Sequence, residues 1–149
     1  MIQTAIVAFV AFILAYVMAL LILRKKNRKI FQEKQSVSLN KIFVQKKWIE
    51  IEQTFSLAGP SHFKSSIMEA DKLVDYVLKG KRVRGATFGE RLKNAKSEFL
   101  NYSDYNNLWF AHKVRNNIAH ESTHDLNSSE ARRAIEYYKK ALRELGALS

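Results

Sequence analysis

The fold is decided by residues 41–60, which read KIFVQKKWIEIEQTFSLAGP. Apolar side chains recur there at alternating steps of four and three residues, a spacing that puts them on one face of an α-helix. The positions are Val44, Trp48, Ile51, Phe55 and Ala58. We therefore expect a helix over residues 38–58, ended by Gly59-Pro60, because this pair does not continue a helix.

The rest of the chain after residue 60 shows the same helical spacing, interrupted by a few glycines. Thr87 and Glu90 form a capping-box pattern, which marks the start of one helix. We expect further helices from Ser61 to Gly80, from Thr87 to about Asn101, from Ser103 or Asp104 to about His120, and around residues 131–145 before Gly146. No strand pattern competes. The prediction is an all-α protein with a bundle of four to five helices over residues 38–149.

Toward the N-terminus, residues 2–23 read IQTAIVAFVAFILAYVMALLIL and contain no charged side chain. A helix of this length is roughly 33 Å long, close to the hydrocarbon thickness of a bilayer. A signal peptide would carry its positive charge before a shorter apolar segment, and a buried core helix of this kind needs a larger protein around it. The sequence therefore predicts a transmembrane anchor over residues 1–23.

A basic run follows the apolar segment directly, within a juxtamembrane segment over residues 24–37. Lys and Arg beside a membrane helix are retained on the cytoplasmic side and attract anionic lipid headgroups. The expected headgroup contacts are Arg24, Lys25, Lys26, Arg28 and Lys29. We expect a single-pass membrane protein with its N-terminus outside, its helical domain in the cytoplasm, and the lipid bilayer as one partner.

The net charge is +11 and the chain has no cysteine. Disulfides and cysteine-based zinc sites are thereby excluded, which agrees with a reducing cytoplasm. About half of the excess charge lies in the helical domain, so RNA, a nucleotide or another anion is an open partner. His112 and His120 stand eight residues apart without an obvious third ligand, and we expect neither a metal nor a cofactor.

His112, Asn116 and His120 fall on one stripe of their helix, because each step of four residues turns it by about 40°. Trp109 lies beside this stripe. A tryptophan among imidazoles and amides is typical of a contact surface. We expect Trp109 and His112 to lie on a dimer face.

At Arg115-Asn116-x-x-x-His120 the chain resembles the HEPN superfamily of small helical bundles, in which an arginine and a following polar residue precede a histidine. The layout over residues 61–148 is also similar: an early helix with the acidic segment 69–75, a glycine-bearing loop, the Arg-to-His helix and a closing helix. The resemblance implies either metal-independent RNA cleavage or non-catalytic binding of a nucleotide, an RNA or a protein partner such as a nucleotidyltransferase.

Carried over to this sequence, the resemblance makes His120 the acid/base, Arg115 the phosphate clamp and Asn116 an orienting hydrogen-bond donor. RNA supplies its own nucleophile in the 2′-OH, so an imidazole and a guanidinium suffice without metal. On one helix Arg115 lies about 140° from His120. HEPN nucleases are dimeric with the site at the interface, and we expect a homodimer here.

A second basic run occupies residues 79–84, and we expect it to bind phosphates of RNA together with His112. Its cations are Lys79, Lys81, Arg82 and Arg84. A solvated loop would explain the same run, and His120 would equally serve as the C-terminal cap of its helix. A non-catalytic interaction module that holds a protein partner at the membrane therefore stays open beside the ribonuclease.

Overall fold

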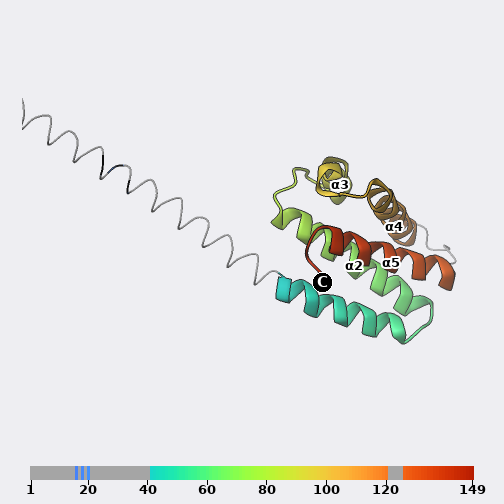
Figure 1. Cartoon of the computed structure of the whole chain (residues 1–149). Coiled ribbons are helices and arrows are strands. Elements are labelled where there is room, and N and C mark those ends of the chain that lie inside the picture. Colours follow the sequence, from blue (N-terminus) through green and yellow to red (C-terminus); the bar gives the residue numbers. More distant parts are fainter. Residues whose placement is uncertain (1–15, 17, 19, 21–40, 121–125) are drawn as a thin grey trace, which may run out of the picture. The chain divides into compact units, whose positions relative to one another are not determined.

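The computed structural model describes residues 16, 18, 20, 41–120 and 126–149 (Figure 1). The chain divides into two compact units, Met1–Leu39 and Asn40–Ser149. In the described ranges all regular secondary structure is helical, which confirms the prediction of an all-α bundle. The elements are a helix over residues 41–56, α2 (Pro60–Gly80), α3 (Phe88–Asn94), the 3₁₀ turn η1 (Lys96–Glu98), α4 (Tyr102–His120) and α5 (Ser128–Glu144).

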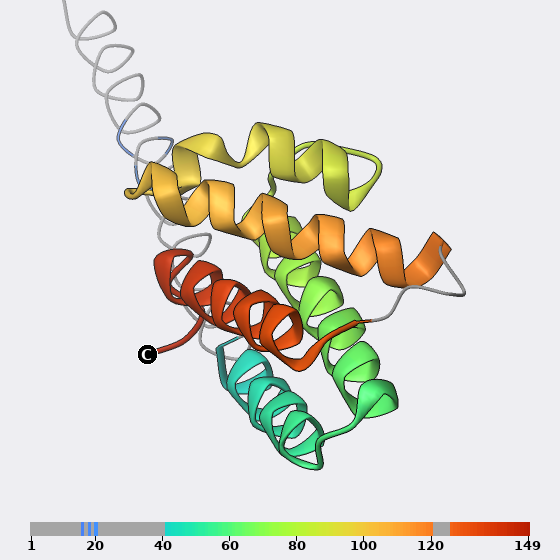
Figure 2. The same ribbon diagram turned by 90° about the vertical axis from the view of Figure 1, so that its right-hand side faces the viewer.

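The last helix, α5, packs against both α2 and α4. Figure 2 shows α5 flanked by α4 on one side and by the 41–56 helix on the other. Lys139 on α5 contacts Glu52 of the 41–56 helix, with Nζ 2.5 Å from Oε1. The expected apolar stripes meet in one core, except that the first helix ends at residue 56 and Ala58 lies exposed beyond it with φ +54°. The largest fully buried side chains of the core are Tyr138, Ile67, Leu78, Leu92, Leu108 and Leu142.

Two helix starts differ from the prediction. The N-cap of α2 is Gly59, with Pro60 in the first turn and no side-chain cap, so Ser61 does not have that role. Proline suits this position because its missing N–H would have no partner there. At the start of α4, Asn101 Oδ1 accepts a hydrogen bond from the backbone N–H of Ser103 at 2.9 Å, so the capping side chain comes earlier than expected.

The third helix is shorter than predicted. Its start is confirmed, because the Thr87 side chain accepts a hydrogen bond from the backbone N–H of Glu90. It ends at Asn94 instead of near Asn101, and the 3₁₀ turn follows. Phe99 then adopts an extended backbone and lies buried with its ring 5.7 Å from that of Tyr105. The break thus turns an aromatic side chain into the core.

The described residues include no helix that is both long and apolar enough to cross a membrane. A span needs about 20 predominantly apolar residues, whereas α2 and α4 both carry charged side chains along their length. This finding contradicts the predicted single-pass membrane location with a cytoplasmic domain, and that prediction is withdrawn. The segment 1–23 itself, apart from Tyr16, Met18 and Leu20, and the cations of residues 24–29 lie outside the described residues.

Candidate functional site

A carboxylate lies at the centre of the bundle. Asp71 on α2 is only 5% exposed, and its Oδ1 accepts two hydrogen bonds. One comes from the Tyr138 hydroxyl on α5 at 2.9 Å, and the other from Nδ1 of His112 on α4 at 2.8 Å. A buried carboxylate is costly unless hydrogen-bonded, so these contacts both satisfy Asp71 and tie three helices together.

The contacts continue from His112 along α4. His112 Nε2 lies 3.2 Å from Asn116 Nδ2, and Arg115 Nη1 donates to Asn116 Oδ1 at 3.2 Å. Arg115 Nε lies 3.4 Å from Asp71 Oδ2, an ion pair without hydrogen-bond geometry. We call Asp71, His112, Arg115, Asn116 and Tyr138 the polar network.

Aromatic rings enclose the imidazole of His112. The Phe88 ring meets it edge-on at 4.7 Å, and the Trp109 ring lies 6.1 Å away. Gly89 also lies beside it, since a Cβ at that position would be in ordinary van der Waals contact with Nε2 at 3.7 Å. His112 is 8% exposed and Trp109 is half-buried against the core. His112, which we expected to bind phosphate and to lie on a dimer face, is therefore in the interior of the bundle.

Tyr138 donates to Asp71 from a fully buried position. Burial raises the pKa of Tyr138 well above its usual 10.0, and the neighbouring Asp71 raises it further. Both effects disfavour the phenolate, since it would place a second negative charge in the core. The phenol is consequently a permanent donor at neutral pH.

The residues of the Arg115-to-His120 motif have different surroundings. Arg115 and Asn116 belong to the polar network, and the Arg115 side chain is 27% exposed. His120 is the last residue of α4 and is exposed, and its imidazole has no hydrogen bond to any described residue. The structure thus joins Arg115 and Asn116 to His112, whereas His120 lies outside that group.

The basic segment 79–84 is partly neutralised. Lys79 Nζ lies 2.7 Å from Asp75 Oδ2, and Lys81 Nζ lies 3.0 Å from Glu98 Oε2. Arg82 and Arg84 are exposed and have no ion pair with a described residue. These two guanidiniums are the cations of the segment that remain open to an anion.

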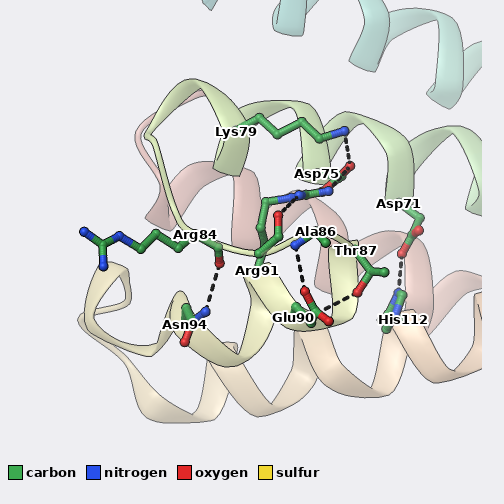
Figure 3. Close-up of polar contacts among 11 residues, drawn as sticks. Asp71, Asp75, Lys79, Arg84, Ala86, Thr87, Glu90, Arg91, Asn94 and His112 are labelled. Atoms are coloured by element: carbon green, nitrogen blue, oxygen red, sulfur yellow. Dashed lines mark hydrogen bonds and ion pairs between the residues drawn. The ribbon is translucent and has the colours of Figure 1, made fainter.

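Arg91 holds this segment in place. Its Nε and Nη2 donate to the two carboxylate oxygens of Asp75 at 2.6 and 3.0 Å, and its Nη1 donates to the Gly85 carbonyl. Asn94 Nδ2 donates to the Arg84 carbonyl at 2.9 Å (Figure 3). Burial alone would raise the pKa of Asp75, but the hydrogen bonds from Arg91 and Lys79 outweigh it and lower that pKa. The loop backbone is therefore fixed before any ligand arrives.

Sequence reasoning missed Asp71, Tyr138 and Arg91 as site residues. A signal for Asp71 was present, because it shares a helical face with Ile67 and Val74, where a charged side chain is out of place. Tyr138 lies on an apolar stripe and reads as a packing residue. Arg91 has no sequence signal, since its burial depends on the approach of α2 to α3.

Metal binding has no support in the part of the chain that the structure describes, where no three His, Asp or Glu side chains are grouped to hold an ion. Polar side chains of the network face one another instead. Comparison with known families, curated proteins and solved structures gives no match to this chain.

Proposed function

We propose that the helical bundle is an HEPN-like domain that binds RNA or a nucleotide through Arg115. The observation that carries the proposal is the state of this guanidinium, which is half-buried, paired with Asp71 and hydrogen-bonded to Asn116. A guanidinium held in one orientation loses little entropy on binding, and its planar fork suits phosphate oxygens. The net charge of +11 favours a polyanionic ligand.

In the catalytic form of the proposal, Arg115 stabilises charge on the scissile phosphate while the His120 imidazole accepts the proton of the attacking 2′-OH. The 2′-O–P bond forms as the P–O5′ bond breaks, which leaves a 2′,3′-cyclic phosphate, and the 5′-oxygen that departs takes up the proton that the imidazole has accepted. His120 is exposed at the end of α4, so an RNA strand can reach its imidazole. A second copy of the domain would supply His120 to the Arg115 of the first. Arg82 and Arg84 would contact phosphates further along the strand.

A non-catalytic interaction module is the second candidate, and one observation favours it. Large apolar side chains are exposed on the bundle, and two of them lie together: Phe43 is 43% exposed, Tyr76 is 40% exposed, and their ring centroids are 5.1 Å apart. Exposed apolar side chains are typical of protein contacts when they gather in a patch. In this reading the polar network is structural, and Asp71 only holds three helices together.

Cleavage distinguishes the two candidates. The full chain, Arg115→Ala and His120→Ala would be incubated with mixed-sequence RNA in the presence of a metal chelator. Lys113→Ala is the matched control, because Lys113 is an exposed cation on the same helix outside the polar network. The catalytic proposal predicts that the wild type and Lys113→Ala cleave the RNA, and that the cleavage rate falls at least a hundredfold in Arg115→Ala and His120→Ala. Equal background in all four proteins would remove the catalytic proposal.

Binding is measured separately, by fluorescence anisotropy with a labelled single-stranded RNA. Wild-type binding that weakens in Arg115→Ala but not in Lys113→Ala would support the phosphate role without catalysis. Light scattering tests the shared site, because a monomer at tens of micromolar would exclude a site built from two copies.

A further inference from the structure

We infer that Asp71 and His112 are positioning residues for the Asn116 amide and, through that amide, for the Arg115 guanidinium. They act through a chain of hydrogen bonds, which we call the relay, and each bond of the relay has its donor on the Arg115 side and its acceptor on the Asp71 side. The phosphate role of Arg115 rests on the proposed function. The relay itself does not rest on the proposed function, because its hydrogen bonds belong to the folded bundle whether or not RNA binds.

The direction of the relay follows from Arg115, because a guanidinium has donors and no acceptor. Asn116 must therefore turn its Oδ1 toward Arg115 Nη1, at 3.2 Å, and its Nδ2 toward His112 Nε2, also at 3.2 Å. The amide nitrogen only donates, so His112 Nε2 accepts. The imidazole proton is then on Nδ1, which donates to Asp71 Oδ1 at 2.8 Å. A carboxylate accepts hydrogen bonds, so both ends of the relay require the same direction.

The relay is anchored in the core and ends near the surface. Tyr138 fixes Asp71 from α5, and the rings of Phe88 and Trp109 flank His112, so neither buried group is free to turn. Burial makes each of these hydrogen bonds costly to lose. Because Asn116 bonds both to the fixed His112 and to Arg115, the orientation of the Arg115 side chain is also fixed, although this side chain is 27% exposed.

Asn116 is the position where the relay can be reversed. The charged groups in contact with this part of the network are Asp71 from α2 and Arg115 on α4. Tyr138 from α5 contacts it through Asp71, and Phe88 and Gly89 of α3 lie beside His112. Asn116→Asp puts an acceptor opposite the lone pair of His112 Nε2. The imidazole must then carry a proton on Nε2, whereas Asn116→Leu, which has no polar group, makes no such demand.

Nitrogen NMR of the histidine side chains tests this directly in the full chain labelled with ¹⁵N-histidine. We expect the Nδ1–H tautomer of His112 in the wild type at pH 7.5, the same tautomer in Asn116→Leu, and a proton on Nε2 in Asn116→Asp. Tyr138→Phe is the control, because it removes a donor to Asp71 and leaves the bond between His112 and Asn116 in place. Wild-type His112 with its proton on Nε2 alone, or a spectrum unchanged by Asn116→Asp, would overturn the relay.

RNA binding tests whether the relay positions Arg115. Asn116→Leu should weaken the affinity for a labelled mixed-sequence single-stranded RNA about tenfold, and should cause no further loss in an Arg115→Ala background. A structural role would instead give losses that add. If the wild type binds no RNA, the proposed function fails, while the histidine spectra still decide the relay.

Discussion

Gly85 directly follows the basic segment 79–84, and we expect Gly85→Ala to destabilise the fold strongly. Gly85 has φ +151°, and a Cβ there would lie 2.5 Å from the backbone nitrogen of Arg91 and 2.8 Å from the carbonyl carbon of Glu90. Both atoms belong to the backbone of α3, which cannot rotate away as a side chain can. The loop or the first turn of the helix must therefore shift, and the hydrogen bond from Arg91 to the Gly85 carbonyl is lost with it.

Two costs add in this variant. A residue with a side chain in a glycine-only backbone region costs about 1–3 kcal/mol, and overpacking costs about 1–3 kcal/mol more, so we expect a loss of about 4 kcal/mol. Gly146→Ala is the matched control. Gly146 also has a positive φ, +69°, but a Cβ there meets nothing within 4 Å. Only the left-handed conformation is penalised, at about 1 kcal/mol.

Urea unfolding of the full chain, followed by circular dichroism, measures both variants against the wild type. With a slope of about 1–3 kcal/mol per molar urea, the difference of about 3 kcal/mol between them separates their midpoints by 1 M or more. Equal midpoints for Gly85→Ala and Gly146→Ala would show that the loop does not approach α3 as described. The fixed presentation of the basic segment would then be refuted as well.

Three further predictions concern pH and salt. Asp75 has a lowered pKa in the folded chain, so its contribution to stability is present above its usual pKa of 3.8 and is lost as the pH falls through the lower, folded-state pKa. The difference in urea midpoint between the wild type and Asp75→Asn should therefore narrow from pH 6 to pH 3. Tyr138→Phe should cost about 1–2 kcal/mol at pH 7 by urea unfolding. Because the folded pKa of Tyr138 is raised, that difference should shrink as the pH rises above 10. Replacing Arg82 and Arg84 by Gln should make the negative slope of log affinity against log salt concentration shallower by about 1.4 for single-stranded RNA, measured by fluorescence anisotropy.

The helices of the bundle were predictable because each buries a stripe of apolar side chains whose spacing is written in the chain. Val44, Trp48 and Ile51 are buried as that spacing requires. Helix ends depend on single hydrogen bonds and were less predictable. Asn101 caps α4 in place of the predicted Ser103 or Asp104, and the third helical segment ends early where Phe99 turns into the core.

The candidate site was predictable only where its residues share a helix. Arg115 and Asn116 are neighbours in sequence, so the motif identifies them. Asp71 and Tyr138 reach the same point from other helices, and their pairing depends on how α2 and α5 rotate against α4. Spacing within one helix carries no information on that rotation.

The two motif residues differ in a way that suits different tasks. A group that stabilises developing charge is most effective when its orientation is fixed beforehand, and Arg115 is held by Asp71 and Asn116. A group that exchanges protons must meet both substrate and solvent, and His120 is exposed at the end of α4. His112 has the opposite character, because both of its ring nitrogens already have partners in the interior. Of the two histidines on α4, the proposed proton transfer therefore belongs to His120, and the orientation of Arg115 depends on His112.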